Sequence, residues 1–340
     1  MVKILLENDA NINSRSSVGA TPLMCAVDNG HINIVEHLLC CGANVNCCTD
    51  ASIYALNHAI KNGNPKIAKV LIDWGADINI KDQKGLSLLH YAIGDENMQF
   101  ITMLLEHKIH VNACDTYGIA PLYGAVRWGD VEMVSLLLRN GAKVDTMDSY
   151  GRCPLFIAAA RGHMDICKCL LDHGALVNVC SPKGRTALYH AMPHDHRGIC
   201  RLLIDRGANV NATDIWGNTM LHYFPAGKAW AGLDIRKLLI EHGADVNARN
   251  LKGETPIYSA IRIGSVELVN LYLGHGANVA VCNKKGLSPV QVAIGLGDPS
   301  ILEILENHAN DADARMAVRN YKRARESDFL DMLSKKTKND

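Results

Sequence analysis

The sequence NLKGETPIYSAIRIGSVELVNLYLGHGANVAVC, residues 250–282, contains the pattern that decides the fold. Gly253 is expected in a turn, because glycine adopts a positive φ at little cost. Thr255 and Pro256 follow as the N-cap and the first turn of a helix. Apolar residues at helical spacing then lead to Gly276, which is expected to end a second helix in the left-handed conformation. The stretch therefore predicts two short helices joined by a turn.

The same marks recur along the chain in a single phase. A second copy of the Gly-x-x-Pro-aliphatic mark begins at Gly19, a third at Gly151 and a fourth at Gly286. The Gly-Ala-x-Val/Ile mark, followed by Asn in five of its seven copies, recurs at intervals of 33 residues or multiples of 33, apart from one interval of 36, at Gly42, Gly75, Gly141, Gly174, Gly207, Gly243 and Gly276. Self-similarity at this period is the signature of a repeat architecture.

The unit G-x-T-P-L-x-x-A, then G-H-x-x-I-V, then L-L-x-x-G-A-x-V-N, resembles the ankyrin repeat, and the resemblance covers residues 2–315. It implies an all-α fold, an ankyrin-repeat α-solenoid of helix-turn-helix pairs with protruding β-turn or hairpin fingers. We expect a partial repeat, the second helix only, in residues 1–15, nine repeats in residues 16–315, and a C-terminal tail in residues 316–340. The nine repeats are expected to start at Ser16, Thr49, Asp82, Asp115, Asp148, Ser181, Asp214, Asn250 and Asn283.

Two neighbouring repeats depart from the pattern and are expected to be the least stable. Repeat 49–81 has Ser52 and Ala55 where the pattern has glycine and proline. Repeat 82–114 has Lys108 at the helix-ending glycine phase. A side chain at a position that needs positive φ costs free energy that glycine avoids.

The later repeats also differ from the pattern. Repeat 214–249 carries three extra residues within residues 225–233. Pro225 is expected to shorten its first helix, and a longer loop carrying Trp230 is expected to follow. After Pro299 the pattern decays, and a polar last repeat of this kind suits a C-terminal cap.

Both ends of the chain carry unusual segments. Residues 2–12 predict a lone second helix in which Leu5 and Leu6 have no first helix to cover them. One interpretation is that the array begins upstream and that the chain is a fragment or isoform of a longer protein. Residues 327–334 predict a short capped amphipathic helix, which either packs on the last repeat or docks on a partner.

Composition narrows the class of protein. The 340 residues carry 35 Lys and Arg against 35 Asp and Glu, which argues against a protein that coats nucleic acid or an anionic membrane. No stretch approaches the roughly 18 apolar residues of a membrane span. The N-terminus does not resemble a signal peptide, and the 12 cysteines are interpreted as reduced thiols. The sequence therefore favours the cytoplasm or the nucleus.

Histidine and cysteine are abundant, but the repeat phase explains most of them. Ten of the 15 histidines fall at recurring positions. Two clusters remain: Cys40 and Cys41 with Cys47 and Cys48, and His190, His194 and His196 with Asp195. The adjacent cysteine pairs do not match zinc spacing, and the histidines are interpreted as a polar loop. Because no nucleophile elbow, phosphate loop or dinucleotide fingerprint is found, we predict no metal, no cofactor and no catalysis.

The candidate binding residues lie at the variable positions of each repeat, which are expected to line a concave face. In the first two repeats these positions carry mostly small or polar residues and are expected to contribute little. In the middle repeats they carry the types enriched at interface hot spots: Tyr117, Arg127, Trp128, Tyr150, Arg152, Arg161, Lys183, Arg185 and Trp216. The alternative is that each ring packs locally on its own finger.

These residues predict a protein partner with an extended or acidic segment, because arginine binds carboxylates in pairs of hydrogen bonds. The neutral net charge makes nucleic acid a weaker candidate. We predict a monomeric, non-catalytic protein-protein interaction module, a scaffold or adaptor. The alternative is the substrate-recognition subunit of a ubiquitin ligase, or the recognition arm of a larger multidomain protein, and a second domain would distinguish it.

The resemblance also implies a modification. Proteins of the ankyrin family are frequent substrates of an asparaginyl hydroxylase that acts on the finger asparagine of L-x-x-G-A-D-V-N. Asn247 matches this sequence best, followed by Asn79 and Asn211.

Overall fold

The structure is a computed structural model, and it describes residues 2–223, 233–308, 315–316, 318–321 and 323. Within these ranges every regular element is helical and no strand is present. Two isolated antiparallel bridges, Cys48 to Tyr54 and Lys81 to Ser87, close the bases of two long loops. The all-α class predicted from the sequence is confirmed.

The chain divides into two compact units. The first comprises Met1–Ala158 and Asp165–Ala175, and the second comprises Ala159–Met164 and Leu176–Asp340. In both, a first helix and a second helix form a pair, and a longer loop leads to the next pair. We call this longer loop a finger.

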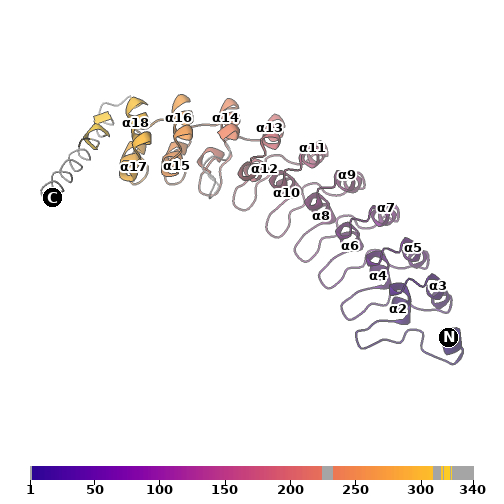
Figure 1. The fold of residues 1–340 in the computed structure, drawn as a ribbon. Helices are drawn as coiled ribbons and strands as arrows, with labels where there is room; N and C mark the ends of the chain where they lie inside the picture. Colours follow the sequence, from indigo (N-terminus) through magenta and orange to yellow (C-terminus); the bar gives the residue numbers. More distant parts are fainter. Residues whose placement is uncertain (1, 224–232, 309–314, 317, 322, 324–340) are drawn as a thin grey trace, which may run out of the picture. The chain divides into compact units, whose positions relative to one another are not determined.

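The first unit stacks its helix pairs in chain order. The first helices contact one another in succession, from α2 to α4, α6 and α8, and each also contacts the second helix of its own pair. Their fingers extend from the same side of the pairs (Figure 1). The elements are α1 (Val2–Glu7), α2 (Pro22–Asp28), α3 (Ile32–Cys40), α4 (Ala55–Lys61), α5 (Pro65–Asp73), α6 (Leu88–Gly94), α7 (Met98–Glu106), α8 (Pro121–Trp128) and α9 (Val131–Arg139).

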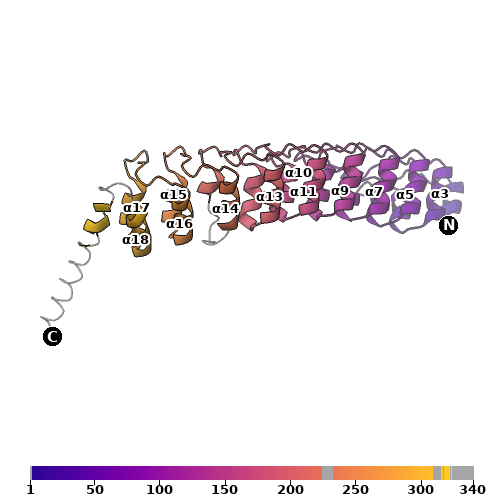
Figure 2. The same cartoon turned by 90° about the horizontal axis from the view of Figure 1, so that it is seen from above.

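Two further helices, α10 (Pro154–Arg161) and α11 (Met164–Asp172), hold residues of both units. In the second unit, α15 contacts α16 and α17, and α18 contacts α16 and α17 (Figure 2). The remaining elements are α12 (Ala187–Ala191), the 3₁₀ helix η1 (Met192–His194), α13 (Arg197–Asp205), the 3₁₀ helix η2 (Met220–His222), α14 (Leu233–Glu241), α15 (Pro256–Arg262), α16 (Val266–Gly274), α17 (Pro289–Leu296) and α18 (Pro299–His308). No helix of the described chain is long and apolar enough to cross a membrane.

The core follows the repeat phase. Leucines 33 residues apart on the second helices of the first unit, Leu71, Leu104, Leu137 and Leu170, are all 0 % exposed. A single pair cannot bury these side chains, whereas stacked neighbours can, so the hydrophobic effect stabilises the array through nearest-neighbour contacts.

Each finger is organised by the first residue of its repeat. The carboxylate of Asp115 accepts hydrogen bonds from the backbone N–H groups of Tyr117, at 2.8 Å, and Ile119, at 2.9 Å. An Asx turn of this kind fixes the finger without regular secondary structure. The same two bonds occur at Asp82, Asp148, Asp214, Asn250 and Asn283.

A ladder of asparagines joins successive fingers. The Oδ1 atom of Asn46 accepts from the N–H of Asp77 at 2.8 Å, and its Nδ2 donates to the carbonyl of Gly75 at 3.1 Å. The same pair of bonds is made by Asn112, Asn178, Asn211 and Asn247. These side chains therefore satisfy backbone groups of the next repeat.

The recurring glycines of the repeat pattern adopt the positive φ values expected for them. Gly253 and Gly276 have φ values of 74° and 82°. Ser52 and Lys108, which replace glycine, adopt φ values of 57° and 59° in the same left-handed region. The expected cap at Thr255 is only partly right: its backbone is extended as an N-cap requires, but its hydroxyl makes no cap hydrogen bond.

The structure follows the expectations for the two later irregular repeats to different degrees. In repeat 214–249, η2 spans only three residues where a longer first helix stands elsewhere. Pro225 and Trp230 lie outside the described residues, as do residues 327–334. The decay predicted after Pro299 does not interrupt the helix, because α18 continues to His308 with Ile301, Leu302 and Leu305 buried.

Candidate functional site

In the first unit, two predicted tyrosines lie at the tips of adjacent fingers. The Ser149 N–H and hydroxyl both donate to the carbonyl of Tyr117 at 2.8 Å, which joins the two tips. Tyr117 is 56 % exposed and Tyr150 is 64 % exposed. These rings face solvent although burial would be favourable, so they are available to a partner.

Arg127 and Trp128 are the last two residues of α8, the first helix of its pair. Trp128 is 56 % exposed, and Arg127 is exposed beside it. The helix stops there because Gly129 follows with a φ of 90°, a C-terminal left-handed cap. Trp128 is therefore held on a short, well-terminated helix rather than on a mobile loop.

Arg152 is engaged within the chain. Its Nε donates to the Oδ2 of Asp148 at 2.7 Å, and the Asp148 side chain is fully buried. Its guanidinium carbon also lies 5.0 Å from the ring centre of Tyr150 and 5.6 Å from that of Tyr123. Arg152 thus stabilises its own finger through an ion pair and cation–π contacts.

Arg185 has the corresponding role in the second unit. Its guanidinium carbon lies 5.4 Å from the ring centre of Tyr223 and 6.0 Å from that of Tyr189. The two rings meet edge to face at 5.8 Å. The local packing that was the alternative reading thus accounts for Arg152 and Arg185, whereas Arg161 and Lys183 are exposed.

The fingertips of the second unit form a continuous row. The N–H of Ile215 donates to Lys183, that of Leu251 to Trp216, and that of Lys284 to Lys252, at 2.9–3.1 Å. Ile215, Trp216 and Leu251 are 53 %, 48 % and 61 % exposed. We call this set the fingertip row: Lys183, Ile215, Trp216, Leu251, Lys252, Lys284 and Lys285, all of them exposed.

The fingertip row is positive as well as apolar. Its four lysines form no ion pair with any described residue. The nearest acids in the same turns are buried: Asp214 accepts backbone hydrogen bonds, and Glu254 is paired with Arg262. The Arg262 guanidinium lowers the pKa of Glu254 below its usual value.

The sequence-level metal candidates are not assembled. Among the described residues, no group of three or more His, Cys, Asp or Glu side chains could hold a metal ion. His194 and His196 stack with ring centres 5.7 Å apart, and burial lowers the pKa of His190 to about 4. All 12 cysteines are free thiols. Burial raises the pKa of Cys167 and Cys200 to about 12, so both behave as small apolar residues.

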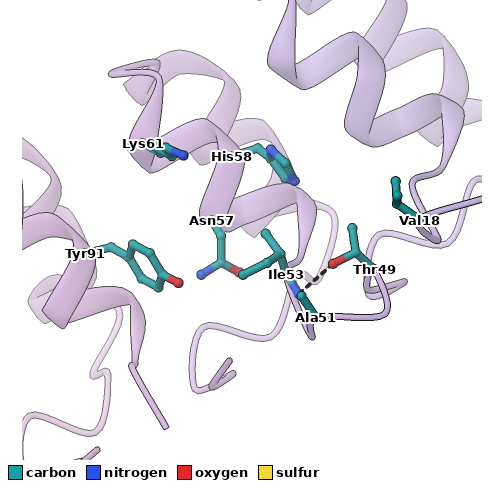
Figure 3. A pocket seen from close by; sticks show the side chains of 8 residues that line it. All are labelled: Val18, Thr49, Ala51, Ile53, Asn57, His58, Lys61 and Tyr91. Atoms are coloured by element: carbon teal, nitrogen blue, oxygen red, sulfur yellow. Dashed lines mark hydrogen bonds between the residues drawn. The ribbon is translucent and has the colours of Figure 1, made fainter. Parts of the chain in front are cut away.

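A cavity of about 340 Å³ is lined by residues of the first two repeats, where the sequence predicted little, and by Tyr91 of the third (Figure 3). Its lining comprises Val18, Thr49, Ala51, Ile53, Asn57, His58, Lys61 and Tyr91. Four of these residues occupy the variable positions of their repeats, so the repeat phase did contain the signal. Reading those positions by residue type favoured aromatic residues and arginine, and it missed a site lined by Val18, Ala51, Ile53 and Lys61.

Comparison with known families identifies the repeat. A family model described as ankyrin repeats matches residues 1–49, 56–148 and 140–214, and a second model of that description matches residues 239–293. The chain belongs to the ankyrin repeat family. No curated protein matches the sequence as a relative. Ankyrin repeats are generally protein-protein interaction modules and typically non-catalytic, so the surfaces above are considered as binding surfaces.

Proposed function

We propose that this ankyrin repeat chain is a non-catalytic scaffold or adaptor whose second unit binds an extended, acidic partner segment along the fingertip row. The observation that carries the proposal is the composition of that row. Exposed cations lie on both sides of three large apolar side chains, and no exposed carboxylate shares these tips. Acidic side chains on a partner would meet Lys183, Lys252 and Lys284, while apolar side chains would cover Trp216 and its neighbours.

The aromatic residues of the first unit support a second contact surface. Tyr117, Tyr150 and Trp128 are each more than half exposed. Truncating such residues at a hot spot costs about 2 kcal/mol or more of binding free energy. Because Arg152 has a structural role, its substitution is not a clean test of binding, and the three rings are the better targets.

The proposal includes a monomer in the cytoplasm or nucleus that uses no cofactor. The zero formal net charge and the free thiols support this placement. A ubiquitin-ligase receptor or an arm of a larger assembly remains the competing proposal, and the proteins captured by the intact chain distinguish the two.

The experiment is quantitative affinity purification with mass spectrometry. Trp216→Ala combined with Lys252→Glu should remove the partners captured by the wild type and leave the thermal midpoint unchanged, since both side chains are exposed. Lys237→Glu, an exposed position on α14, is the matched control. Equal loss of partners in the control would place the binding site elsewhere. Co-purified ligase subunits would favour the competing proposal.

A further inference from the structure

The cavity of the first unit is lined by two successive fingers and by the helices α4 and α6. Val18 comes from one finger, Ala51 and Ile53 from the next, Asn57, His58 and Lys61 from α4, and Tyr91 from α6 (Figure 3). The finger is closed by the N–H of Thr49, which donates to the Ile53 carbonyl at 2.8 Å, and by the N–H of Ile53, which donates to the Thr49 hydroxyl at 3.1 Å.

One of the fingertip side chains that line the cavity is small. Ala51 is the third residue of its repeat. The same position in the other repeats carries Val18, Lys84, Tyr117, Tyr150, Lys183, Trp216, Lys252 and Lys285, all larger than alanine. Ala51 is therefore the smallest residue at this position among the nine repeats.

The size of the cavity suits part of a peptide. Its volume of about 340 Å³ is more than twice the roughly 150 Å³ in which an engineered apolar cavity binds benzene. It lies at the lower end of the roughly 300–1,000 Å³ of small-molecule sites. Val18, Ala51 and Ile53 provide an apolar wall, which one aliphatic side chain can cover.

Two polar groups of the cavity, the Asn57 amide and the Lys61 ammonium, are donors without an acceptor among the described residues. Asn57 is 4 % exposed, and its Oδ1 accepts from the Tyr54 N–H at 3.0 Å. Its Nδ2 makes no hydrogen bond to the described residues and points toward Tyr91. Lys61 is exposed at the rim and forms no ion pair within the described chain.

The nearest acids are already occupied. The Oδ1 of Asp28 contacts His58 Nδ1 at 2.6 Å and accepts from Asn62 Nδ2 at 3.1 Å. The Tyr91 hydroxyl donates to Asp82 at 2.8 Å, which leaves its ring toward the cavity.

We infer that this cavity binds a partner peptide in which an aliphatic side chain is followed closely by a carboxylate. The aliphatic group packs on Val18, Ala51 and Ile53, and the carboxylate accepts from the Lys61 ammonium and the Asn57 amide. Charge complementarity selects the carboxylate, because the unpaired groups are a cation and a neutral donor. That the ligand is a peptide rests on the proposed function. The residues that line the cavity do not belong to the fingertip row.

The test is selection of a random peptide library on the intact chain, followed by calorimetric titration of one selected peptide. The wild type should enrich peptides with Leu, Ile or Val within two residues of Asp or Glu. Ala51→Tyr, which places at this tip the residue found in two other repeats, should lower the affinity for the selected peptide at least tenfold. Val18→Tyr, which narrows the cavity from the preceding finger, should lower the affinity by a similar factor. This second variant keeps the test decisive if Ala51→Tyr does not fold.

Two further variants separate the parts of the inference. Lys61→Gln should keep the aliphatic preference and lose the acidic one, while Lys66→Gln, on the exposed side of α5, should keep both. Trp216→Ala with Lys252→Glu should leave the binding of these peptides unchanged. A failure of the fingertip proposal can therefore be distinguished from a failure of the cavity proposal. Selected peptides that are basic, that lack the aliphatic residue, or that bind Ala51→Tyr as well as the wild type overturn the inference.

Discussion

The hydroxyl of Tyr272 donates a 2.8 Å hydrogen bond to the carbonyl of Leu221, 51 residues earlier in the chain. Leu221 belongs to η2, which is too short to supply its own i→i+4 donors. Arg236 completes the same end by donating to the Tyr223 carbonyl at 2.6 Å. Two long side chains therefore satisfy the backbone of an interrupted helix.

Removing the Tyr272 hydroxyl should destabilise the second unit. Tyr272 is 0 % exposed, so Tyr272→Phe leaves the Leu221 carbonyl without this donor and should cost about 1–3 kcal/mol of unfolding free energy. Denaturant titration measures the change. Tyr117→Phe removes an exposed hydroxyl and should have no measurable effect. An unchanged free energy of unfolding in Tyr272→Phe would show that the Leu221 carbonyl has another donor.

The repeat phase predicted the helices and the turns of this chain because each mark has a local physical cause. Gly276 and Ala260 are needed wherever two such helices stack, whatever the partner. The roles of Arg152 and Arg185 were not predictable in this way. Their contacts depend on Tyr123 and Tyr223, which lie 29 and 38 residues away, and on side-chain directions that the repeat does not fix.

The cavity at Ala51 was missed for a related reason. The sequence analysis searched for residue types enriched at interfaces, whereas one wall of this site is lined by the small side chain of Ala51. Comparing the size of the residue at one position across all nine repeats would have singled out Ala51.

Lys108→Gly should stabilise the first unit. Lys108 has a φ of 59°, where a side chain costs about 1–2 kcal/mol that glycine avoids. Part of this gain is offset by the greater freedom of glycine in the unfolded chain, so we expect a net increase of about 1 kcal/mol. Thermal and denaturant unfolding test it, and Lys84→Gly at an exposed fingertip is the control. A decrease would show that the Lys108 side chain makes a stabilising contact.

Two histidines, the half-buried His90 and the buried His222, should make the fold sensitive to acid. Backbone N–H groups of Ser87 and Thr219 donate to Nδ1 of His90 and His222, so each ring is neutral with its proton on Nε2. That Nε2 donates to the carbonyl of the next repeat at 3.0 Å in both cases. Burial lowers the pKa of both below the ordinary 6.5.

Because the folded pKa is below the unfolded one, the stabilisation is complete above pH 6.5 and is lost as the pH falls through the folded pKa. The free energy of unfolding should therefore decrease from pH 6.5 to 5. His90→Gln with His222→Gln should flatten this dependence. Identical slopes in the wild type and the variant would contradict the assignment.

Asn247 should be the preferred site of asparaginyl hydroxylation. It belongs to the asparagine ladder, where its Nδ2 donates to Gly276 at 2.9 Å and its Oδ1 accepts from Asn278 at 2.8 Å. After co-expression with the hydroxylase, peptide mass spectrometry should find one added oxygen atom on Asn247 before Asn79 or Asn211. Unmodified Asn247 peptides would remove the prediction.

Hydrogen exchange should reveal where the array opens first. Exchange is fastest where few apolar side chains are buried and where the backbone is strained. No residue of α1 is buried, so residues 2–7 should exchange first. Repeats 49–114 should follow, because Ser52, Glu96 and Lys108 adopt positive φ without being glycine.

Protection should be highest on the helices that bury large side chains against both neighbours. Helix α15 contacts α16 and α17, and Tyr258 is 0 % exposed and donates to the Val281 and Leu287 carbonyls at 2.6 and 2.7 Å. Its amides should therefore outlast those of α4 and α6. In Leu170→Ala, which removes a fully buried leucine at a cost of about 2–5 kcal/mol, protection should fall in the first unit. Uniform protection from Thr49 to Cys282 in the wild type would contradict this order, because nearest-neighbour stacking would then not determine where the array opens.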